Sequence, residues 1–246
     1  MEIEGKVAVV SGGASGIGRA AVLALVERGA KVVVADVDED GGRQTVDMAG
    51  EKGGIALFRH CNVTKTEVLS SAFDWAVEHF GRFDIAFNNA GIGGEDLFAD
   101  DSGDWARIIA IDLTAVIDAT RLAVRKMRLS GNPGVIINTA SMIGLWPMPS
   151  APVYAAAKAG VVNFSRSLAY LAQESNIRVN AICPELVDTP MATGLGEERL
   201  EELRTTGGIL MPEDIAAGVV ELIEDDSRFG AVMKVTIFGG REFATS

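Results

Sequence analysis

Short apolar runs rich in β-branched residues alternate along the chain with longer segments in which apolar residues recur every three or four positions. The short runs predict strands; they are Lys6–Val10, Lys31–Asp36, Ile55–Arg59, Ile85–Phe87, Gly134–Thr139, Ile177–Ile182 and Val232–Ile237. The longer segments predict helices; they are Ile17–Arg28, Val68–Phe80, Trp105–Met127, Tyr154–Ala172 and Pro212–Glu224. Because the strand segments are apolar throughout, both faces of the sheet should be covered.

This alternation predicts an α/β fold with a doubly wound, parallel, seven-stranded sheet and helices on both faces. We see no linker, and 246 residues of which 48% are hydrophobic can bury a full core, so we expect one domain over residues 1–246. Four glycine pairs fall where loops are expected: Gly41–Gly42, Gly53–Gly54, Gly93–Gly94 and Gly207–Gly208.

Composition narrows the function classes. The net charge of −12 argues against a nucleic-acid partner, because no basic cluster offsets the repulsion of phosphates. The opening MEIEGKVAVV resembles neither a signal peptide nor a membrane span, so we expect a cytoplasmic protein without a membrane partner. The two cysteines, Cys61 and Cys183, lack CxxC spacing, and we expect neither a disulfide framework nor a metal site.

A glycine-rich turn, SGGASGIG, connects the first expected strand to the first expected helix. Gly12, Gly16 and Gly18 let the backbone approach a phosphate at the N-terminus of that helix, where unpaired N–H groups carry partial positive charge. Arg19 and Ala20 stand where a nucleoside-triphosphate loop needs Lys and Ser or Thr, so a dinucleotide is favoured over ATP. A tight turn in any α/β protein is the structural alternative.

The second expected strand ends at Asp36. A carboxylate at this place accepts hydrogen bonds from the adenosine ribose hydroxyls and repels a 2′-phosphate, and Ala14, Ser15 and Val37 supply no compensating cation. We therefore predict NAD rather than NADP as the cofactor. The alternative is that Asp36 simply begins the acidic loop that follows.

Tyr154 and Lys158 form Y-A-A-A-K, and residues four apart share one face of a helix. The adjacent ammonium favours the phenolate, which makes Tyr154 a candidate general base. Ser141 closes the strand GVIINTAS, from which its hydroxyl can point into the same cleft. The second tyrosine, Tyr170, has Glu174 at the corresponding offset and lacks this support. Read alone, the Tyr–Lys spacing also fits a chance pair on a solvated helix.

Four motifs, taken together and in this order, resemble those of the short-chain dehydrogenase/reductase family, and the resemblance covers nearly the whole chain. They are SGGASGIG at Ser11–Gly18, NNAG at Asn88–Gly91, Ser141 with Tyr154 and Lys158, and CPELVDT at Cys183–Thr189. The segments RVNAICPELVDT and ELIEDDSRFGAVMKVT are similar to the branch of NAD-linked hydroxyprostaglandin dehydrogenases. Ala151 differs from that branch, which has a glutamine contacting substrate three residues before the tyrosine.

The resemblance implies a Rossmann fold and hydride transfer between NAD(H) and an alcohol or ketone. It implies that Tyr154 takes the alcohol proton, that Ser141 holds the substrate oxygen, and that Lys158 binds the nicotinamide ribose and tunes Tyr154. The implied cofactor-binding residues are Gly12, Ser15, Gly16, Ile17, Gly18, Asp36, Asn62, Val63, Asn88, Ala90, Gly91, Lys158, Pro184, Val187 and Thr189.

Three positions depart from the family pattern. Asp112 stands where the family has an asparagine that anchors a water leading to Lys158. Our hypothesis is that the enzyme with Asp112 is active but has an altered pH profile. We therefore include Asp112 among the candidate catalytic residues. Glu185 replaces the glycine after Pro184, where its side chain would either line the substrate mouth or point to solvent. Asn62 replaces an aspartate near adenine, and its amide can donate and accept hydrogen bonds.

The loops beside these residues predict an apolar substrate pocket, although some of their side chains could instead pack in the core. The residues are Met142, Leu145, Trp146, Met148, Leu186 and Met191. Methionines adapt to irregular shapes, so we expect a hydrophobic secondary alcohol or its ketone. We expect residues 186–212 to form a lid over the site, and its central part, Ala192–Leu210, contains several glycines. The charged run EERLEELR within that part fits a solvated surface helix equally well.

The sequence thus favours an NAD-dependent alcohol dehydrogenase. A catalytically weakened NAD-binding scaffold or sensor is the alternative from another class. A 3-oxoacyl-type reductase is disfavoured by Asp36 and by the acidic surface. Apolar residues on more than one face of the helices expected at Trp105–Met127 and Tyr154–Ala172 predict a homodimer or homotetramer, without choosing between them.

Overall fold

The computed structural model describes residues 1–94, 97 and 104–244 of the chain. Its strands are β1 (Val7–Ser11), β2 (Lys31–Asp36), β3 (Ile55–His60), β4 (Ile85–Asn88), β5 (Gly134–Thr139), β6 (Ile177–Pro184), β7 (Val232–Thr236) and β8 (Gly240–Phe243). Its α-helices are α1 (Gly16–Val26), α2 (Glu39–Glu51), α3 (Thr66–Phe80), α4 (Asp104–Ile109), α5 (Ala115–Ser130), α6 (Pro152–Ser167), α7 (Leu171–Ser175), α8 (Glu197–Thr206) and α9 (Pro212–Glu224). A π-helical turn η1 (Ala110–Thr114) and two 3₁₀ turns, η2 (Met142–Gly144) and η3 (Pro190–Leu195), complete the elements.

The strands form one sheet in the order β3-β2-β1-β4-β5-β6-β7-β8. Strands β1 to β7 are parallel, as expected, whereas β8 pairs antiparallel with β7 and adds an eighth strand that the hydrophobic pattern did not predict. Its sequence, Gly240–Phe243, is short and mostly exposed, so it carries no apolar run. The strand order reverses between β1 and β4, and in sheets of this kind ligands bind at the carboxyl edge of that switch point.

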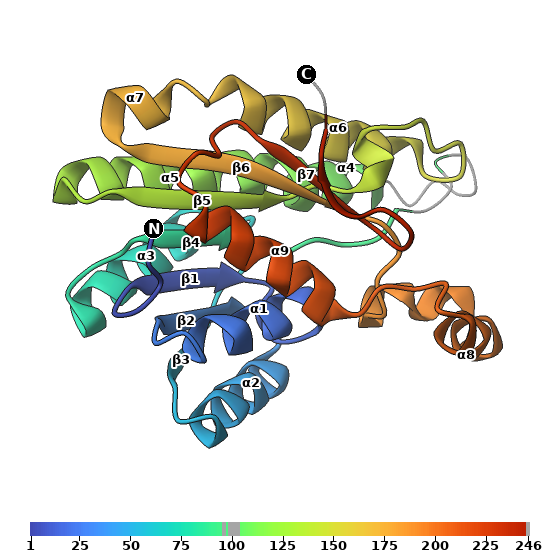
Figure 1. Cartoon of the computed structure of the whole chain (residues 1–246), viewed down its shortest axis with the longest axis horizontal. Coiled ribbons are helices and arrows are strands. Elements are labelled where there is room, and N and C mark those ends of the chain that lie inside the picture. The colour runs from blue at the N-terminus through green and yellow to red at the C-terminus, as the bar shows by residue number, and fades with distance from the viewer. Residues whose placement is uncertain (95–96, 98–103, 245–246) are drawn as a thin grey trace.

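Helices cover both faces of the sheet, and α1 packs beside α9 on one of them (Figure 1). Ala8 and Val10 of β1 contribute to the core on the α1 and α9 side, whereas Val7 and Val9 contribute to the core that contains α3 and α5. Successive side chains of a strand point to opposite faces, so a strand covered on both faces needs apolar residues at every position. This explains the uninterrupted apolar runs.

Three helical segments differ from their predicted form. The single helix expected at Tyr154–Ala172 ends at Ser167, and the short helix α7 follows it as a separate element. The Gly41–Gly42 pair lies inside α2 rather than in a loop. Position 42 needs a glycine because a Cβ there would lie 2.2 Å from the Phe58 ring. The single helix expected at Trp105–Met127 is divided into α4 and α5 by the π turn η1, which contains Asp112.

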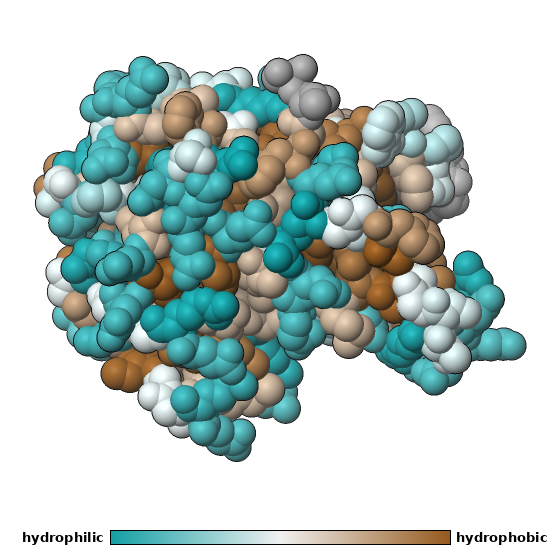
Figure 2. All heavy atoms as spheres, viewed as in Figure 1, coloured by the Kyte–Doolittle hydropathy of each residue, from teal (hydrophilic) through white to brown (hydrophobic). Residues whose placement is uncertain are grey.

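Polar residues dominate the face shown in Figure 2, in keeping with the charge of the chain, and hydrophobic residues gather between the C-terminal hairpin and α8. No helix within the described ranges is long and apolar enough to cross a membrane. Cys61 and Cys183 are buried free thiols. Within those same ranges no three His, Cys, Asp or Glu side chains are placed to hold a metal ion.

Candidate active site

The glycine turn follows β1 at the switch point, and its glycines are required by close packing. Gly12 has φ +68°, and a Cβ there would lie 2.8 Å from the Ala90 Cα; a Cβ on Gly18 would lie 1.9 Å from the Gly12 carbonyl oxygen. Ser15 caps α1 without a side-chain hydrogen bond to the helix. The first turn of α1 therefore presents backbone N–H groups at the carboxyl edge of the sheet, which suits a phosphate.

Asp36 lies beside this turn at the end of β2. Its Oδ2 accepts a hydrogen bond from the Ala14 N–H (3.0 Å) and its Oδ1 accepts one from the Asp38 N–H (3.0 Å). The nearby Arg19 guanidinium donates to the Thr45 hydroxyl (3.0 Å) and to backbone carbonyls, so it is engaged by the protein itself. The edge of the turn thus presents a carboxylate.

The segment after β4 lies against the same turn. The Asn89 side-chain amide donates to the carbonyl oxygens of Ser11 and Gly12 (both 3.3 Å), and the Ser11 hydroxyl accepts hydrogen bonds from the Asn89 and Ala90 N–H groups. Sequence reasoning missed Asn89, although the doubled asparagine of NNAG was the signal that could have identified it. Thr139 of β5 donates to the Asn89 Oδ1 (3.2 Å), which links the glycine turn to the strand that leads to Ser141.

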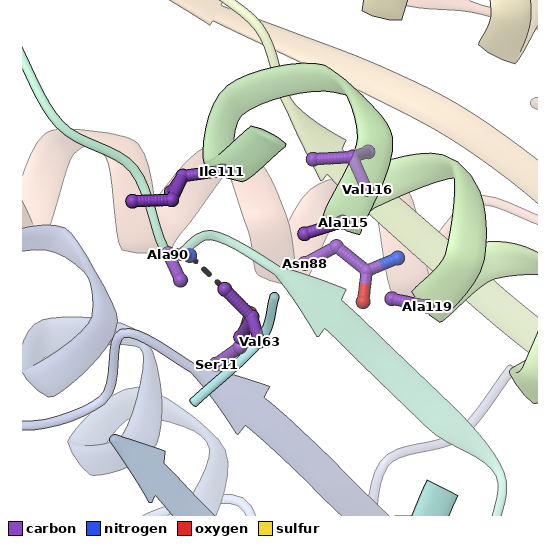
Figure 3. A pocket seen from close by; sticks show the side chains of 8 residues that line it. All are labelled: Ser11, Val63, Asn88, Ala90, Ile111, Ala115, Val116 and Ala119. Carbon is purple, nitrogen blue, oxygen red and sulfur yellow. Dashed lines mark hydrogen bonds between the residues drawn. The ribbon is translucent and has the colours of Figure 1, made fainter. Parts of the chain in front are cut away.

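Figure 3 shows a small pocket at this point, in which three predicted cofactor-binding residues, Val63, Asn88 and Ala90, meet. Its lining is completed by Ser11, Ile111, Ala115, Val116 and Ala119. Asn62, just before Val63, uses its side-chain oxygen to accept hydrogen bonds from the Thr64 N–H (3.0 Å) and hydroxyl (2.8 Å).

The Asn88 side chain belongs to a buried polar network rather than to an open surface. It donates to the Asn138 Oδ1 (2.8 Å) and the Thr120 hydroxyl (3.2 Å), and the Asn138 amide donates to the Ser165 hydroxyl (3.0 Å). These side chains are almost completely buried and join β4, β5, α5 and α6 beneath the site. The network fixes the relative positions of these four elements, and no sequence motif indicated it.

Tyr154 and Lys158 share one face of α6, as their spacing predicts. The Lys158 Nζ lies 5.4 Å from the centroid of the Tyr154 ring and donates a hydrogen bond to the Thr139 carbonyl oxygen (3.1 Å). Lys158 is buried, whereas Tyr154 is partly exposed. Ser141 lies just after β5 at the same edge and begins the turn η2; its hydroxyl accepts from the Ile143 N–H (3.2 Å) and donates to the Pro184 carbonyl oxygen (3.5 Å).

Asp112 lies in η1, and its Oδ1 is 3.6 Å from the Lys158 Nζ. The same oxygen accepts a hydrogen bond from the Ile92 N–H (3.0 Å). Burial raises the pKa of the Asp112 carboxyl, opposed by the Lys158 ammonium and by the Ile92 N–H. Gly91 is the residue that lets this carboxylate approach, because a Cβ there would lie 2.7 Å from Asp112 Oδ1.

The chain leaves β6 at Pro184 and passes back toward the glycine turn. A Cβ on Gly16 would lie 2.9 Å from the Thr189 Cγ2, so these two predicted cofactor residues are neighbours. Val187 is buried and forms an isolated β-bridge with Leu210. The Glu185 carboxylate accepts a hydrogen bond from the Ile237 N–H (2.9 Å), so this exposed side chain ties the end of β6 to the segment after β7.

The predicted lid has its own small apolar cluster, and the bridge between Val187 and Leu210 joins the two ends of the segment. It contains η3 and α8, and its small apolar cluster is formed by Leu186, Ala192, Leu200, Leu203 and Ile209. Leu200 is the buried residue of α8, whose charged positions face solvent.

The six predicted pocket residues divide into two groups. Met142 and Leu145 pack against the cluster that includes Val161, and Leu186 packs inside the lid. Trp146, Met148 and Met191 are 64%, 38% and 51% exposed, so these three side chains are not packed in the core. Ile17, a predicted cofactor residue, packs against the core on the α1 side and remains partly exposed.

Comparisons with known proteins agree with this geometry. The family model described as short chain dehydrogenase matches residues 6–200. The 15-hydroxyprostaglandin dehydrogenase [NAD(+)] of Bos taurus is 38% identical, over 99% of this chain and 95% of the relative, which confirms the predicted resemblance to that branch. A cyclohexanol dehydrogenase of an Acinetobacter species (strain SE19) is 34% identical, over 91% and 90% of the two chains.

The fold has close counterparts among solved structures. A short-chain type dehydrogenase/reductase from Mycobacterium marinum superposes with a TM-score of 0.85 at 27% identity, covering 96% of this chain and 95% of that one. The predicted Rossmann-type architecture is thereby confirmed, with the added antiparallel strand β8 as its one difference in strand number. With the family model matching most of its length, this chain belongs to the short-chain dehydrogenase family.

Proposed function

We propose that this protein is an NAD-dependent dehydrogenase that oxidises a hydrophobic secondary alcohol to its ketone and catalyses the reverse reduction. The observation that carries the proposal is the position of the Lys158 ammonium, 5.4 Å from the Tyr154 ring centroid and hydrogen-bonded to β5 beside Ser141. A phenol next to a buried cation is suited to exchange a proton with an alcohol.

The described residues fit a nicotinamide dinucleotide. The glycine turn leaves backbone N–H groups of α1 for the pyrophosphate, and a side chain at Gly12 or Gly18 would collide with the backbone of Ala90 or Gly12 and displace the turn. The Asp36 carboxylate suits the adenosine ribose hydroxyls and repels a 2′-phosphate, and the engaged Arg19 supports this preference for NAD. When bound, NAD⁺ supplies the acceptor for the hydride that leaves the carbinol carbon.

The protein residues then manage the substrate oxygen and its proton. Tyr154 Oη takes the hydroxyl proton as the C–H bond breaks, and Ser141 Oγ holds the same oxygen by a hydrogen bond. In ketone reduction Tyr154 returns the proton. Lys158 favours the phenolate, and its hydrogen bond to the Thr139 carbonyl oxygen keeps the ammonium in place.

The substrate is proposed to be an apolar secondary alcohol because the loops that follow Ser141 and Thr189 carry Trp146, Met148 and Met191 with much of their surface exposed. The relatives named above are described as acting on a hydroxyprostaglandin and on cyclohexanol, both of which present a secondary alcohol on an aliphatic carbon. Ala151 is small and buried beside Gly94, so it offers no polar contact to a substrate hydroxyl.

A cofactor-binding scaffold or sensor is the second candidate, favoured by one observation. The Asp112 carboxylate lies 3.6 Å from the Lys158 ammonium and offsets the charge on which Tyr154 depends. The cytoplasmic location and the homo-oligomer remain predictions. Exposed Trp105 on α4 and Ile117 on α5 give a second copy apolar surface to cover, and light scattering in solution measures the subunit number.

The decisive experiment mixes purified protein with NAD⁺ or NADP⁺ and a panel of apolar secondary alcohols, beginning with cyclohexanol, and follows formation of the reduced cofactor. The matched variants are Tyr154→Phe and Tyr170→Phe, since the chain has only these two tyrosines. We expect turnover with NAD⁺, loss of at least about a thousandfold in Tyr154→Phe, and full activity in Tyr170→Phe. Tight NADH binding without turnover of any alcohol or ketone would support the scaffold instead.

A further inference from the structure

The Asp112 carboxylate is fully buried, and its two oxygens have different surroundings. Oδ1 accepts the Ile92 N–H and faces Lys158, whereas Oδ2 is buried with no hydrogen-bond partner anywhere in the described ranges. Buried polar atoms are normally paired, so an unpaired carboxylate oxygen calls for an explanation. The carboxylate is held in a π turn, an irregularity that is frequent at functional sites.

Lys158 connects this carboxylate to the proposed base. Its ammonium lies 3.6 Å from Asp112 Oδ1 and 5.4 Å from the Tyr154 ring centroid. A lysine cation next to a phenol favours the phenolate, and a carboxylate next to the same cation opposes that effect. Because Asp112 and Lys158 are both buried, where solvent screening is weak, the charge of Asp112 acts on the partly exposed Tyr154 through Lys158.

Few other charged groups act on Asp112. Among the described residues, Lys158 of α6 is the charged group that pairs with Asp112, and the segment after β4 contributes only the Ile92 N–H. Asp118 of α5 pairs with Arg121 at the surface, and Arg107 of α4 is exposed. Burial and Lys158 act in opposite directions on the pKa of Asp112, and burial has the larger effect.

We propose that Asp112 is a positioning residue whose carboxylate charge, acting through Lys158, sets the pH at which Tyr154 exchanges the catalytic proton. A proton taken up on the unpaired Oδ2 breaks no hydrogen bond of the described structure, because Oδ1 keeps the Ile92 contact. The carboxyl group can therefore change its charge without moving. The consequence for catalysis rests on the proposed function, but the effect on Tyr154 ionisation does not.

The first measurement is a titration of Tyr154 by the near-ultraviolet absorbance of its phenolate. Since Tyr154 and Tyr170 are the only tyrosines, a Tyr170→Phe background leaves Tyr154 as the sole reporter. Removing the negative charge at position 112 leaves the Lys158 ammonium unopposed. We expect Asp112→Asn in this background to lower the midpoint of Tyr154 ionisation by about one pH unit.

Two further variants make this result specific. Asp112→Ser, a second neutral replacement, should shift the midpoint in the same direction, so the conclusion does not depend on how one variant folds. Asp118→Asn makes the same change of net charge six residues away and should leave the midpoint unchanged. An unchanged or raised midpoint in the folded Asp112 variants would overturn the proposal and leave Asp112 with a structural role.

The second measurement is the pH dependence of kcat/KM for alcohol oxidation. Oxidation needs the phenolate, so the acid limb of the profile should move to lower pH by the same amount in Asp112→Asn. A shifted Tyr154 titration without turnover of any substrate would support the role of Asp112 and reject the proposed function. Turnover with identical profiles in both proteins would reject the role of Asp112 and leave the proposed function intact.

Discussion

Arg204 of α8, the helix of the predicted lid, donates two hydrogen bonds to the Asp188 carboxylate at the base of that segment, Nε to Oδ2 at 2.7 Å and Nη2 to Oδ1 at 2.9 Å. The guanidinium holds the pKa of Asp188 below its usual range. Arg204 also donates to Glu197 at the start of the same helix (2.8 Å). One guanidinium thus joins the lid helix to the segment that carries Val187 and Thr189, the residues expected to contact the cofactor.

The first prediction concerns this contact. Replacing Arg204 by alanine removes the bidentate contact while the backbone bridge between Val187 and Leu210 remains. We expect the lid to be held less firmly over the bound ligands, which raises KM for the alcohol and weakens NADH binding by about threefold to tenfold each. Steady-state kinetics and fluorescence titration with NADH measure the two effects.

Arg199→Ala is the matched control for this change. Arg199 lies on the same helix and pairs with Glu202 at the solvent-exposed surface, so its loss alters the same charge without touching the lid base. Exposed ion pairs of this kind contribute little. Equal effects of the two variants would show that helix charge, and not the contact with Asp188, governs the lid.

The second prediction concerns Gly91, whose missing side chain makes room for Asp112. A Cβ at this position would lie 2.7 Å from Asp112 Oδ1 and 3.5 Å from Lys158 Nζ. Gly91→Ala should displace the Asp112–Lys158 pair and lower kcat by about tenfold or more, because small displacements of catalytic groups have large effects on rate. Gly93→Ala is the control, since its nearest neighbour would be Met191 Cγ at 3.8 Å, an ordinary contact. A fully active Gly91→Ala enzyme would contradict the prediction.

Much of the fold could be predicted because strands buried on both faces must be apolar at every position. Lys31–Asp36 and Gly134–Thr139 begin and end where the hydrophobic pattern placed them. The strand β8 could not be predicted, because an edge strand with exposed residues carries no such pattern. The helix α2 was missed because Gly41 and Gly42 read as a turn until the Phe58 ring that packs against Gly42 is known.

The candidate site could likewise be predicted only in part. The Tyr154–Lys158 pair could be predicted from helical spacing alone, since four residues return a side chain to the same face. The polar network of Asn88, Asn138 and Ser165 could not, because its members are far apart in sequence and meet only after the sheet and two helices have assembled. The exposed position of Trp146 was also beyond prediction, since hydrophobicity alone does not separate an exposed apolar side chain from one in the core.

The third prediction tests cofactor selection at Asp36. Asp36→Asn removes the charge and keeps an oxygen that can accept the Ala14 N–H. We expect the ratio of kcat/KM for NAD⁺ to that for NADP⁺ to fall by about tenfold or more, because the repulsion of the 2′-phosphate is lost. Asp40→Asn makes the same charge change on the exposed first turn of α2 and should leave the ratio unaltered. If wild-type protein already used both cofactors equally, Asp36 would not be the selecting residue.

The fourth prediction concerns Ser165, which accepts a hydrogen bond from Asn138 at 3.0 Å and is completely buried. Ser165→Ala leaves that Asn138 N–H without a partner, and an unpaired buried donor costs about 1–3 kcal/mol in the free energy of unfolding. Alanine also favours the helix over serine, so the intrinsic gain in helix propensity partly masks the loss.

Ser167→Ala separates these two effects. Ser167 lies two residues further along α6, is exposed, and donates only to the Asn163 carbonyl oxygen of its own helix. Ser167 is the last residue of α6, so its gain in propensity is no larger than that of Ser165, and it loses no buried contact. Its free energy of unfolding should stay within about 0.5 kcal/mol of wild type. The difference between the two variants in urea denaturation therefore measures the network contribution. Equal stability of Ser165→Ala and Ser167→Ala would mean that the network beneath the catalytic edge does not stabilise the fold.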